Sequence, residues 1–318
     1  MQLLPVAIMA HNEEKVIRGA IESVLRQKIP AGFTVKIVIC VNGCSDRTED
    51  VVKEIAEEIP DRIDLLSIRE KGKTKAINET IKYLDNTLLP HYEIPYVIFL
   101  DADCNFLGND NLINFVEQFD WNIDLCAVGA DCLPDVAFNY RKDMIAHLYR
   151  AIHGFSRAIR INTISGMCYG IRLSILRIIH FPDFQFAEDM FIAARVNGRF
   201  LKKDNVRIVY KTPKYFTDEI KRRTRQAVST QRYHDYYSYL RKKGDSVKLF
   251  KDSLGSGFKW GKAEDCNIIR AWIGLKGIRS KILVLGYFLI RIFAKVRARI
   301  ILKKLRANSD LDYWKVAR

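Results

Sequence analysis

The chain has 318 residues, 48% of them hydrophobic and 28% charged, and a formal net charge of +15. This composition is typical of a folded globular protein and excludes a disordered or collagen-like chain. The length allows one large α/β domain with an appendage, or two small domains.

Seven cysteines are scattered along the chain, and none forms a Cys-x-x-Cys pair. The odd number and wide spacing favour neither a disulfide framework nor a zinc site and are typical of a reducing compartment. The apolar residues 1–10 have no basic segment before them, and Glu13 and Glu14 follow closely, so we expect no secretory signal. We therefore expect a cytoplasmic protein.

Strand patterns and helix patterns alternate in the first hundred residues. Short apolar runs at residues 3–9, 35–41 and 96–100 predict strands, the last two of them buried, and residues 63–68 predict a weaker strand. Apolar residues recur at helical spacing after the first three of these four segments. Polar loops containing Gly, Asn or Asp follow the strands. The alternation predicts a Rossmann-like α/β fold, with a mostly parallel central sheet and helices on both faces. Functional residues should then lie on the loops at the carboxyl ends of the strands.

Further elements are predicted in the rest of the chain. We expect strands at residues 125–130, 164–172 and within 198–211, helices at 144–159 and 217–240, and a linker at 247–261. These predictions divide the chain into an α/β domain at residues 1–245 and a basic, helical C-terminal region at residues 246–318.

The C-terminal region holds most of the positive charge. Residues 261–318 carry 14 Lys and Arg against 4 Asp and Glu, which is +10 of the total of +15. A basic segment of this kind predicts an anionic partner, either nucleic acid or a membrane surface.

A basic amphipathic helix is expected in this region. Four basic residues recur four apart on one stripe, and four apolar residues fall on another side: Arg291, Lys295, Arg299 and Lys303, and Leu289, Phe293, Val296 and Ile300. Such a helix suits the surface of an anionic membrane, here the inner face of the cell membrane. The alternative is a helix whose apolar side packs on the domain or on a second subunit, so a homo-oligomer stays open.

Two carboxylates end the fourth predicted strand. The apolar residues 96–100 run directly into Asp101-Ala102-Asp103. Side chains two apart on an extended chain share a side, and two like charges that close need a compensating cation or hydrogen-bond donors. Because hard divalent cations prefer carboxylate oxygens, the pattern predicts a metal site, with an Asx-rich turn as the alternative.

A second acidic pair, Glu188-Asp189, opens a predicted helix. Acidic residues at this position are often caps that interact with the helix dipole. The pattern alone therefore leaves a structural and a functional interpretation open.

Six separated segments, in this order, resemble the motifs of the family-2 glycosyltransferases: Asn12-Glu13-Glu14, Asn42-Gly43-Cys44-Ser45-Asp46-Arg47-Thr48, Gly72-Lys73-Thr74-Lys75-Ala76-Ile77-Asn78, Asp101-Ala102-Asp103, Glu188-Asp189 and Arg222-x-x-Arg225-Gln226. These are inverting enzymes with the GT-A fold that transfer a sugar from a nucleotide diphosphate. The resemblance runs from about Val6 to Gln226.

The resemblance implies a role for each segment. Mg²⁺ or Mn²⁺ would be held by Asp103 together with Asp101, and Asp189 would be the catalytic base with Glu188 beside it. The nucleotide-sugar contacts would be Asn12, Glu14, Asn42, Lys73, Asp101, Arg222 and Arg225. The acceptor pocket would be lined by Ser165, Gly166 and Tyr169.

The resemblance also implies partners. We expect a UDP-sugar donor, a glycan or lipid-linked acceptor, and a place in cell-surface polysaccharide synthesis. Val41 and Asn42 stand where the family often has two acids, which leaves the donor base open. The arginine segment lacks the Gln and Trp of processive members, which favours addition of a single sugar.

Two other functions fit parts of the sequence. A sugar nucleotidyltransferase has a similar sheet and metal, but it usually has a glycine-rich loop after the first strand, and residues 10–14 contain no glycine. A nucleic-acid-binding protein could use the basic tail with the aromatic residues Tyr233, Tyr236, Tyr237 and Tyr239. It would leave the paired carboxylates without a role, so we expect no nucleic-acid partner.

Overall fold

The computed structural model describes residues 2–139, 141–159, 164–184, 186–196, 198–242, 272, 274–275 and 277–308. The chain forms two compact units, residues 1–132 with 163–210 and residues 133–162 with 211–317, and each is described by itself. The predicted helix at residues 217–240 therefore groups with the C-terminal helix rather than with the sheet. The predicted boundary at residues 245 and 246 and the predicted linker lie outside the described residues.

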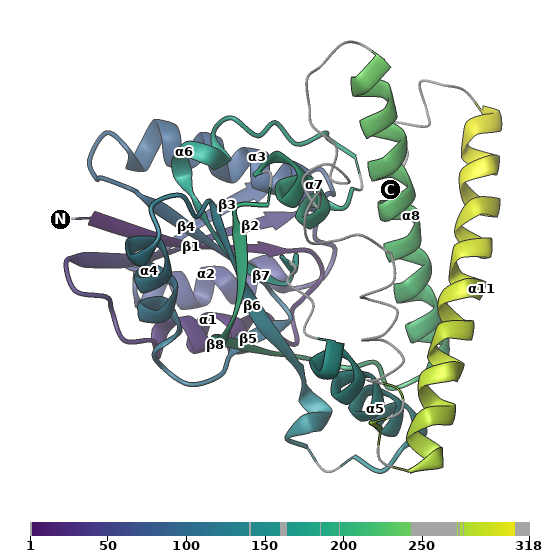
Figure 1. The fold of residues 1–318 in the computed structure, drawn as a ribbon. Helices are drawn as coiled ribbons and strands as arrows, with labels where there is room; N and C mark the ends of the chain where they lie inside the picture. Colours follow the sequence, from purple (N-terminus) through teal and green to yellow (C-terminus); the bar gives the residue numbers. More distant parts are fainter. Residues whose placement is uncertain are drawn as a thin grey trace. The chain divides into compact units, whose positions relative to one another are not determined.

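The first unit is built on an eight-stranded sheet, which Figure 1 shows with its helices. The strands are β1 (Gln2–Ala10), β2 (Phe33–Asn42), β3 (Ile63–Ile68), β4 (Tyr96–Asp101), β5 (Cys104–Phe106), β6 (Ala127–Pro134), β7 (Cys168–Arg172) and β8 (Phe200–Tyr210). The helices of this unit are α1 (Ile17–Leu25), α2 (Thr48–Glu58), α3 (Lys73–Tyr83), α4 (Asn111–Trp121), α6 (Leu173–Leu176) and α7 (Glu188–Arg195), with a π-helical turn η1 (Leu84–Leu88).

The strand order is β3-β2-β1-β4-β7-β6-β8-β5. The predicted parallel half is confirmed, because β1 pairs in parallel with β2 and β4, and β2 pairs in parallel with β3. The other half is antiparallel: β7 pairs with β4 and β6, and β5 with β8. The segment predicted at residues 198–211 forms the single strand β8.

Burial on both faces explains the continuous apolar strands. One face packs on α1, α2 and α4 through a cluster that contains Ile8, Ile21, Val52 and Phe115. Figure 1 draws α3 on the opposite side of the strands from α1 and α2. A strand covered on both sides must be apolar at consecutive positions, which is the pattern in the sequence.

The register brings the ends of three strands to one edge of the sheet. Ala10 is paired with Val41, and Met9 is paired with Asp101. Because β7 runs antiparallel to β4, the residues that precede β7 arrive at this same edge, and the Asp101 amide donates to the carbonyl oxygen of Met167 at 2.8 Å. Polar residues from distant segments are thereby collected at the carboxyl ends of the parallel strands.

The second unit is helical in the described residues. It contains the 3₁₀ turn η2 (Asp135–Ala137), α5 (Met144–Ile159), α8 (Phe216–Lys242) and α11 (Ile278–Asn308). The helix predicted at residues 144–159 is confirmed. Phe155 of α5 packs edge-on against Phe288 of α11, with ring centroids 5.9 Å apart, and Val228 of α8 is buried with Ala298 and Leu302 of α11.

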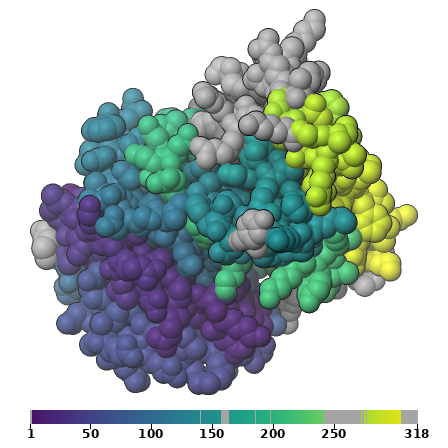
Figure 2. All heavy atoms as spheres, turned by 90° about the horizontal axis from the view of Figure 1, so that it is seen from below, coloured from purple at the N-terminus to yellow at the C-terminus, as the bar shows by residue number. Residues whose placement is uncertain are grey.

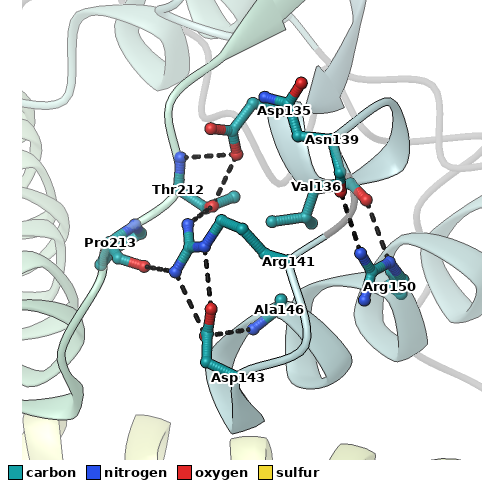
Figure 3. Close-up of polar contacts among 9 residues, drawn as sticks. All are labelled: Asp135, Val136, Asn139, Arg141, Asp143, Ala146, Arg150, Thr212 and Pro213. Carbon is teal, nitrogen blue, oxygen red and sulfur yellow. Dashed lines mark hydrogen bonds and ion pairs between the residues drawn. The ribbon is translucent and has the colours of Figure 1, made fainter.

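A polar network fixes the start of α5 (Figure 3). The carboxylate of Asp143 accepts from the amide of Ala146 at 2.9 Å and therefore caps the helix, and Arg141 donates to it at 2.8 Å. Arg141 also donates to the Thr212 hydroxyl at 2.9 Å, and this hydroxyl in turn donates to Asp135 at 2.6 Å. The segments before α5 and α8 are thus held together.

None of the described helices has the length and apolar character that a bilayer crossing requires.

Candidate active site

The loops after β1 and β2 are joined by side-chain hydrogen bonds. Asn12 has a positive φ of 59°, and its Oδ1 accepts from the Ser45 amide at 2.8 Å. The Glu14 carboxylate accepts from the amide of Arg47 at 3.0 Å. Both predicted nucleotide contacts therefore hold two loops in register, and both side chains lie at the edge where the parallel strands end.

Asn42 locks a third segment to these loops. Its Nδ2 donates to the carbonyl oxygen of Ala10 at 2.9 Å, and its Oδ1 accepts from the Gly72 amide at 3.1 Å. The residue is buried, with 3% exposure. The two ends of its amide therefore hold the loop after β1 and the start of α3 together, and its predicted contact with the nucleotide sugar stays a proposal.

Lys73, the first residue of α3, is the centre of the site. Its Nζ lies 2.6 Å from Oδ1 of Asp101 and 2.6 Å from Oε1 of Glu188, and it donates to the carbonyl oxygen of Gly166 at 2.6 Å. An ammonium group has three donors, and three oxygens from three segments accept from them. The partners of Lys73 in the structure are thus two carboxylates and a carbonyl, and its predicted contact with the nucleotide sugar stays a proposal.

Burial and charge shift the pKa values of this cluster. Burial raises the pKa of Asp101 and of Glu188 above their ordinary values, although the Lys73 charge opposes the shift in both. Burial alone would lower the pKa of Lys73, but the charges of Asp101 and Glu188 outweigh it and raise this pKa well above its ordinary value. Lys73 is therefore charged at neutral pH and is the counterion of the cluster.

Asp189 lies beside this cluster with a different environment. Its Oδ2 accepts from the Gly166 amide at 3.2 Å, and its Oδ1 accepts from the Met190 amide at 2.8 Å. No ion pair of Asp189 is found among the described residues, and its side chain keeps partial exposure. Of the two acids that open α7, Glu188 is held by Lys73, while the partly exposed Asp189 accepts from two backbone amides.

The turn before β7 separates the residues predicted to line an acceptor pocket. Ser165 and Gly166 are partly exposed, and Gly166 contacts Lys73 through its carbonyl and Asp189 through its amide. Tyr169 is different: its side chain is fully buried, and its ring stacks on Phe99 with centroids 5.0 Å apart. Ser165 and Gly166 therefore have surface that an acceptor could touch, whereas Tyr169 has none in this structure, and the predicted acceptor contacts of all three stay proposals.

Asp103 is the most accessible carboxylate of the fourth strand's end. Its side chain is exposed. Burial is the main cause of the raised pKa of Asp101, Lys73 opposes it, and the charge of Asp103 adds to it. The described residues contain no cluster of three His, Cys, Asp or Glu that could enclose a metal ion. Mg²⁺ is commonly held by one or two carboxylates together with substrate phosphates, and the Asp101 and Asp103 pair fits that kind of open donor set.

The predicted arginines lie on α8, in the second unit. Arg222 donates to the Tyr149 hydroxyl at 3.3 Å, and Arg225 is exposed. Arg223, which the sequence did not single out, pairs with the fully buried Glu219 at 2.6 Å and lies over the Tyr287 ring at 4.9 Å. Within this unit Arg223 is therefore structural, and the diphosphate contact of Arg222 and Arg225 stays a proposal.

Comparison with known protein families identifies the fold and the motifs together. The model of glycosyl transferase family 2 matches residues 6–179, which is more than half of the chain. The chain belongs to glycosyl transferase family 2. The match includes the loops after β1 and β2, the start of α3 and the Asp101-Ala102-Asp103 segment, and so confirms the resemblance inferred from the sequence.

Two curated relatives of this family-2 chain act on different molecules. Over 126 residues it is 27% identical to the minor teichoic acid biosynthesis protein GgaB of Bacillus subtilis, covering 39% of this chain and 13% of that protein. Over 116 residues it is 26% identical to the 4,4'-diaponeurosporenoate glycosyltransferase of Staphylococcus aureus, covering 36% of this chain and 28% of that protein. The matched part is thus less than a third of either relative.

A solved structure has the same fold. The mannosyltransferase PcManGT of Pyrobaculum calidifontis, in complex with GDP-Man and Mn²⁺, superposes with a TM-score of 0.58 over 94% of this chain and 84% of that one, at 20% identity. At this identity the likeness shows the fold, and it confirms the expected GT-A architecture. Family membership also favours the glycosyltransferase interpretation over the nucleotidyltransferase and nucleic-acid-binding ones.

Some contacts of this family-2 site were not predicted. His11 donates from Nδ1 to the Asn42 carbonyl oxygen at 2.7 Å, and the Asp46 carboxylate accepts from the Glu14 amide and from Thr48. The Asp46-x-Thr48 spacing is a local Asx-type signal that could have been found in the sequence. The pairing of Lys73 with Glu188 has no local signal, because it joins segments far apart in the chain.

Proposed function

We propose that this family-2 chain transfers a sugar from a nucleotide diphosphate sugar to a hydroxyl of a glycan or lipid-linked acceptor, with inversion at the anomeric carbon. The observation that carries the proposal is the position of Lys73. Its ammonium, 2.6 Å from both Asp101 and Glu188, links the strand end with the predicted metal-binding acids to the acidic start of α7. The acids proposed to bind the metal and the sugar donor thereby lie at the same edge of the sheet as the acids proposed to activate the acceptor.

Inversion needs a base on the side opposite the leaving group. The base must take the acceptor proton as the new bond forms. Asp189 suits this role because its carboxylate is partly exposed and is bonded only to the Gly166 and Met190 amides. Glu188 is held by Lys73, so its proposed role is to orient the neighbouring groups and the acceptor.

A divalent cation would complete the donor side. Mg²⁺ or Mn²⁺ would be held by Asp103 with Asp101 and would neutralise the charge that builds on the departing nucleotide diphosphate. The exposed Asp103 and the open donor set support this assignment. The fold likeness to a mannosyltransferase in complex with Mn²⁺ adds support of a general kind. Lys73 adds a fixed positive charge beside the same position.

The donor and the acceptor are proposed from weaker observations. A UDP-sugar is the expected donor, and a GDP-sugar is the alternative, since the structural relative carries GDP-Man. Relatives named for teichoic acid biosynthesis and for a carotenoid glycosyltransferase support a glycan or lipid-linked acceptor in cell-surface synthesis. Arg222 and Arg225 are proposed to contact the diphosphate, and Ser165 and Gly166 the acceptor.

A panel of nucleotide sugars tests the proposal. Purified protein is incubated with UDP- and GDP-sugars in the presence of Mn²⁺, Mg²⁺ or EDTA, and release of the nucleoside diphosphate is measured. We expect metal-dependent release from one donor, and loss of both release and metal-assisted nucleotide binding in Asp103→Ala. Asp124→Ala, at an exposed acid of the same unit, is the matched control and should behave as wild type. Metal-independent release, or an active Asp103→Ala protein, contradicts the metal assignment.

A further inference from the structure

Helix α11 has two apolar sides, and the described part of the chain covers only one of them. The inner side includes Val284, Ala294, Ala298 and Leu302, which are 1–3% exposed and lie within the second unit. Contacts with Phe155 of α5 and with α8 bury this side. A helix that packs on its own unit through one side normally has a polar opposite side.

The outer side of α11 is apolar as well. Its large side chains recur every three or four residues and form one stripe: Ile278, Ile282, Leu285, Leu289, Ile292, Phe293, Val296 and Ile300. Leu289 is 67% exposed, Ile282 60% and Ile292 58%. At 1.5 Å per residue the stripe is about 33 Å long. Single exposed apolar residues are ordinary, but a contiguous stripe of this length marks an interaction surface.

Basic residues flank the stripe on both sides. With 100° per residue, Arg279 and Arg297 fall on one border, and Lys281 and Arg299 fall on the other. The sequence of α11 contains nine Lys and Arg and no Asp or Glu. Figure 2 shows atoms of α11, in yellow, at the molecular surface. The outer side is therefore an apolar strip between two rows of positive charge.

We propose that this outer side of α11 lies on a membrane surface that carries anionic headgroups. The apolar side chains would enter the interface, and the flanking guanidinium and ammonium groups would meet the lipid phosphates, with the helix axis in the membrane plane. Charge complementarity selects this occupant. A second copy of α11 would bring another nine positive charges against the first nine. The proposal goes beyond the proposed sugar transfer and does not depend on it.

The sequence had left open whether the side with Leu289, Phe293, Val296 and Ile300 packs on the domain. All four side chains are at least 49% exposed, so no described residue of the second unit covers this side. Removing the whole C-terminal region would also remove the inner contacts of α5 and α8. Substitutions on the outer side alone are therefore the better test.

Vesicle flotation of the full-length protein tests the proposal. The vesicles are phosphatidylcholine alone, or phosphatidylcholine in which a third of the lipid is phosphatidylglycerol. We expect flotation with the anionic vesicles only, and release at high salt. The triple substitution L289S/I292S/F293S should reduce bound protein at least tenfold. The control W121S/I123S/I178S changes three residues that are more than 70% exposed in the first unit and should float as wild type.

A charge variant tests the flanks separately. At about fivefold per neutralised basic residue, R279Q/R297Q/R299Q should lower partitioning about a hundredfold. The control R207Q/K211Q/K214Q makes the same change in net charge at exposed positions outside α11 and should retain binding. Circular dichroism confirms that each variant is folded. Nucleotide binding in the absence of lipid confirms that donor binding does not depend on the substituted residues.

Three results would overturn the proposal. The first is wild-type protein that does not float with anionic vesicles at low salt. The second is an outer-side variant that floats as well as its control. The third is a wild-type dimer in sedimentation velocity that becomes a monomer in L289S/I292S/F293S, which would make the outer side a subunit interface.

Discussion

The ammonium nitrogen of Lys73 lies 2.6 Å from Oε1 of Glu188, although the two residues come from the starts of different helices. The same nitrogen reaches Asp101 at the end of β4. One cation thus balances two carboxylates that would otherwise repel each other in a largely buried place. Four predictions follow from this cluster and from the loops around it.

Removing the ammonium should destabilise the protein. Lys73→Met keeps the aliphatic stem and leaves Asp101 and Glu188 without their cation. We expect a loss of about 2–3 kcal/mol, below the range for a fully buried pair, because Lys73 and Asp101 keep 31% and 29% of their side-chain exposure. Urea unfolding at neutral pH measures the change. The control Lys75→Met breaks the ion pair with the exposed Glu70 and should cost under about 1 kcal/mol.

A double-mutant cycle checks the cause. If Lys73 stabilises the protein through Glu188, the double variant Lys73→Met with Glu188→Gln should lose less unfolding free energy than the two single variants lose together. Strict additivity would show that the pair is not coupled.

A methyl group at Gly166 should disturb the acidic pair without unfolding the protein. A Cβ at this position would lie 2.7 Å from Oε1 of Glu188, so the carboxylate that pairs with Lys73 must shift. We expect Gly166→Ala to lower kcat/KM for sugar transfer by about ten- to a hundredfold. Steady-state kinetics with the donor found above measures this.

The matched control is Gly154→Ala on α5, where an added Cβ meets nothing within 4 Å. It should leave the kinetics unchanged. Because Gly154 lies at an exposed position inside a helix, the substitution should stabilise the protein by about 0.5–1 kcal/mol. Wild-type kinetics in Gly166→Ala would mean that the position of Glu188 does not matter for transfer.

Replacing Asp189 by asparagine should separate chemistry from binding. The amide oxygen of Asn can still accept from the Gly166 amide, but the side chain can no longer take a proton. We expect transfer to fall by about 10²–10⁴-fold. Nucleotide affinity, measured by calorimetry, should stay the same. Asp183→Asn, an exposed acid shortly before α7, serves as control; an active Asp189→Asn protein would place the base elsewhere.

The loop after β2 should give the protein a pH-dependent stability. Burial alone would raise the pKa of Asp46, but hydrogen bonds from Thr48 and from the Glu14 amide outweigh it and lower this pKa. A depressed carboxylate pKa adds stability above the unfolded value of about 3.9, and this stability is lost as the pH falls through the folded pKa.

Asp46→Asn tests this sign. At neutral pH the variant should be less stable than wild type by about 1 kcal/mol, because it loses charged acceptors for the Thr48 and Glu14 donors. The difference in urea midpoint between wild type and Asp46→Asn should shrink as the pH is lowered below the pKa of an ordinary aspartate. A difference that is constant with pH would show that the carboxylate charge has no part in it.

The parallel strands and their polar ends could be predicted from local patterns. The apolar runs that became β1, β2 and β4 are largely buried on both faces, so they are visible in the sequence as continuous apolar stretches, whereas the edge strand β3 is only partly buried. The acids at Asp101 and Asp103 follow directly on β4, and the motif order led to the family that the comparison confirmed. The antiparallel half of the sheet was not predicted, because strand direction depends on partners that are far apart in the chain.

The sequence by itself determined which residues end the strands and which segments are helical, since side-chain polarity and period act over a few residues. Only the tertiary structure decided what those residues meet. Lys73 reaches Gly166, 93 positions away, and Tyr169 lies in the interior because β7 pairs with β4. The inner side of α11, which includes Ala294 and Ala298, is buried against other helices of its unit, and the outer side is exposed. Each of these outcomes depends on contacts between distant segments, which local pattern does not contain.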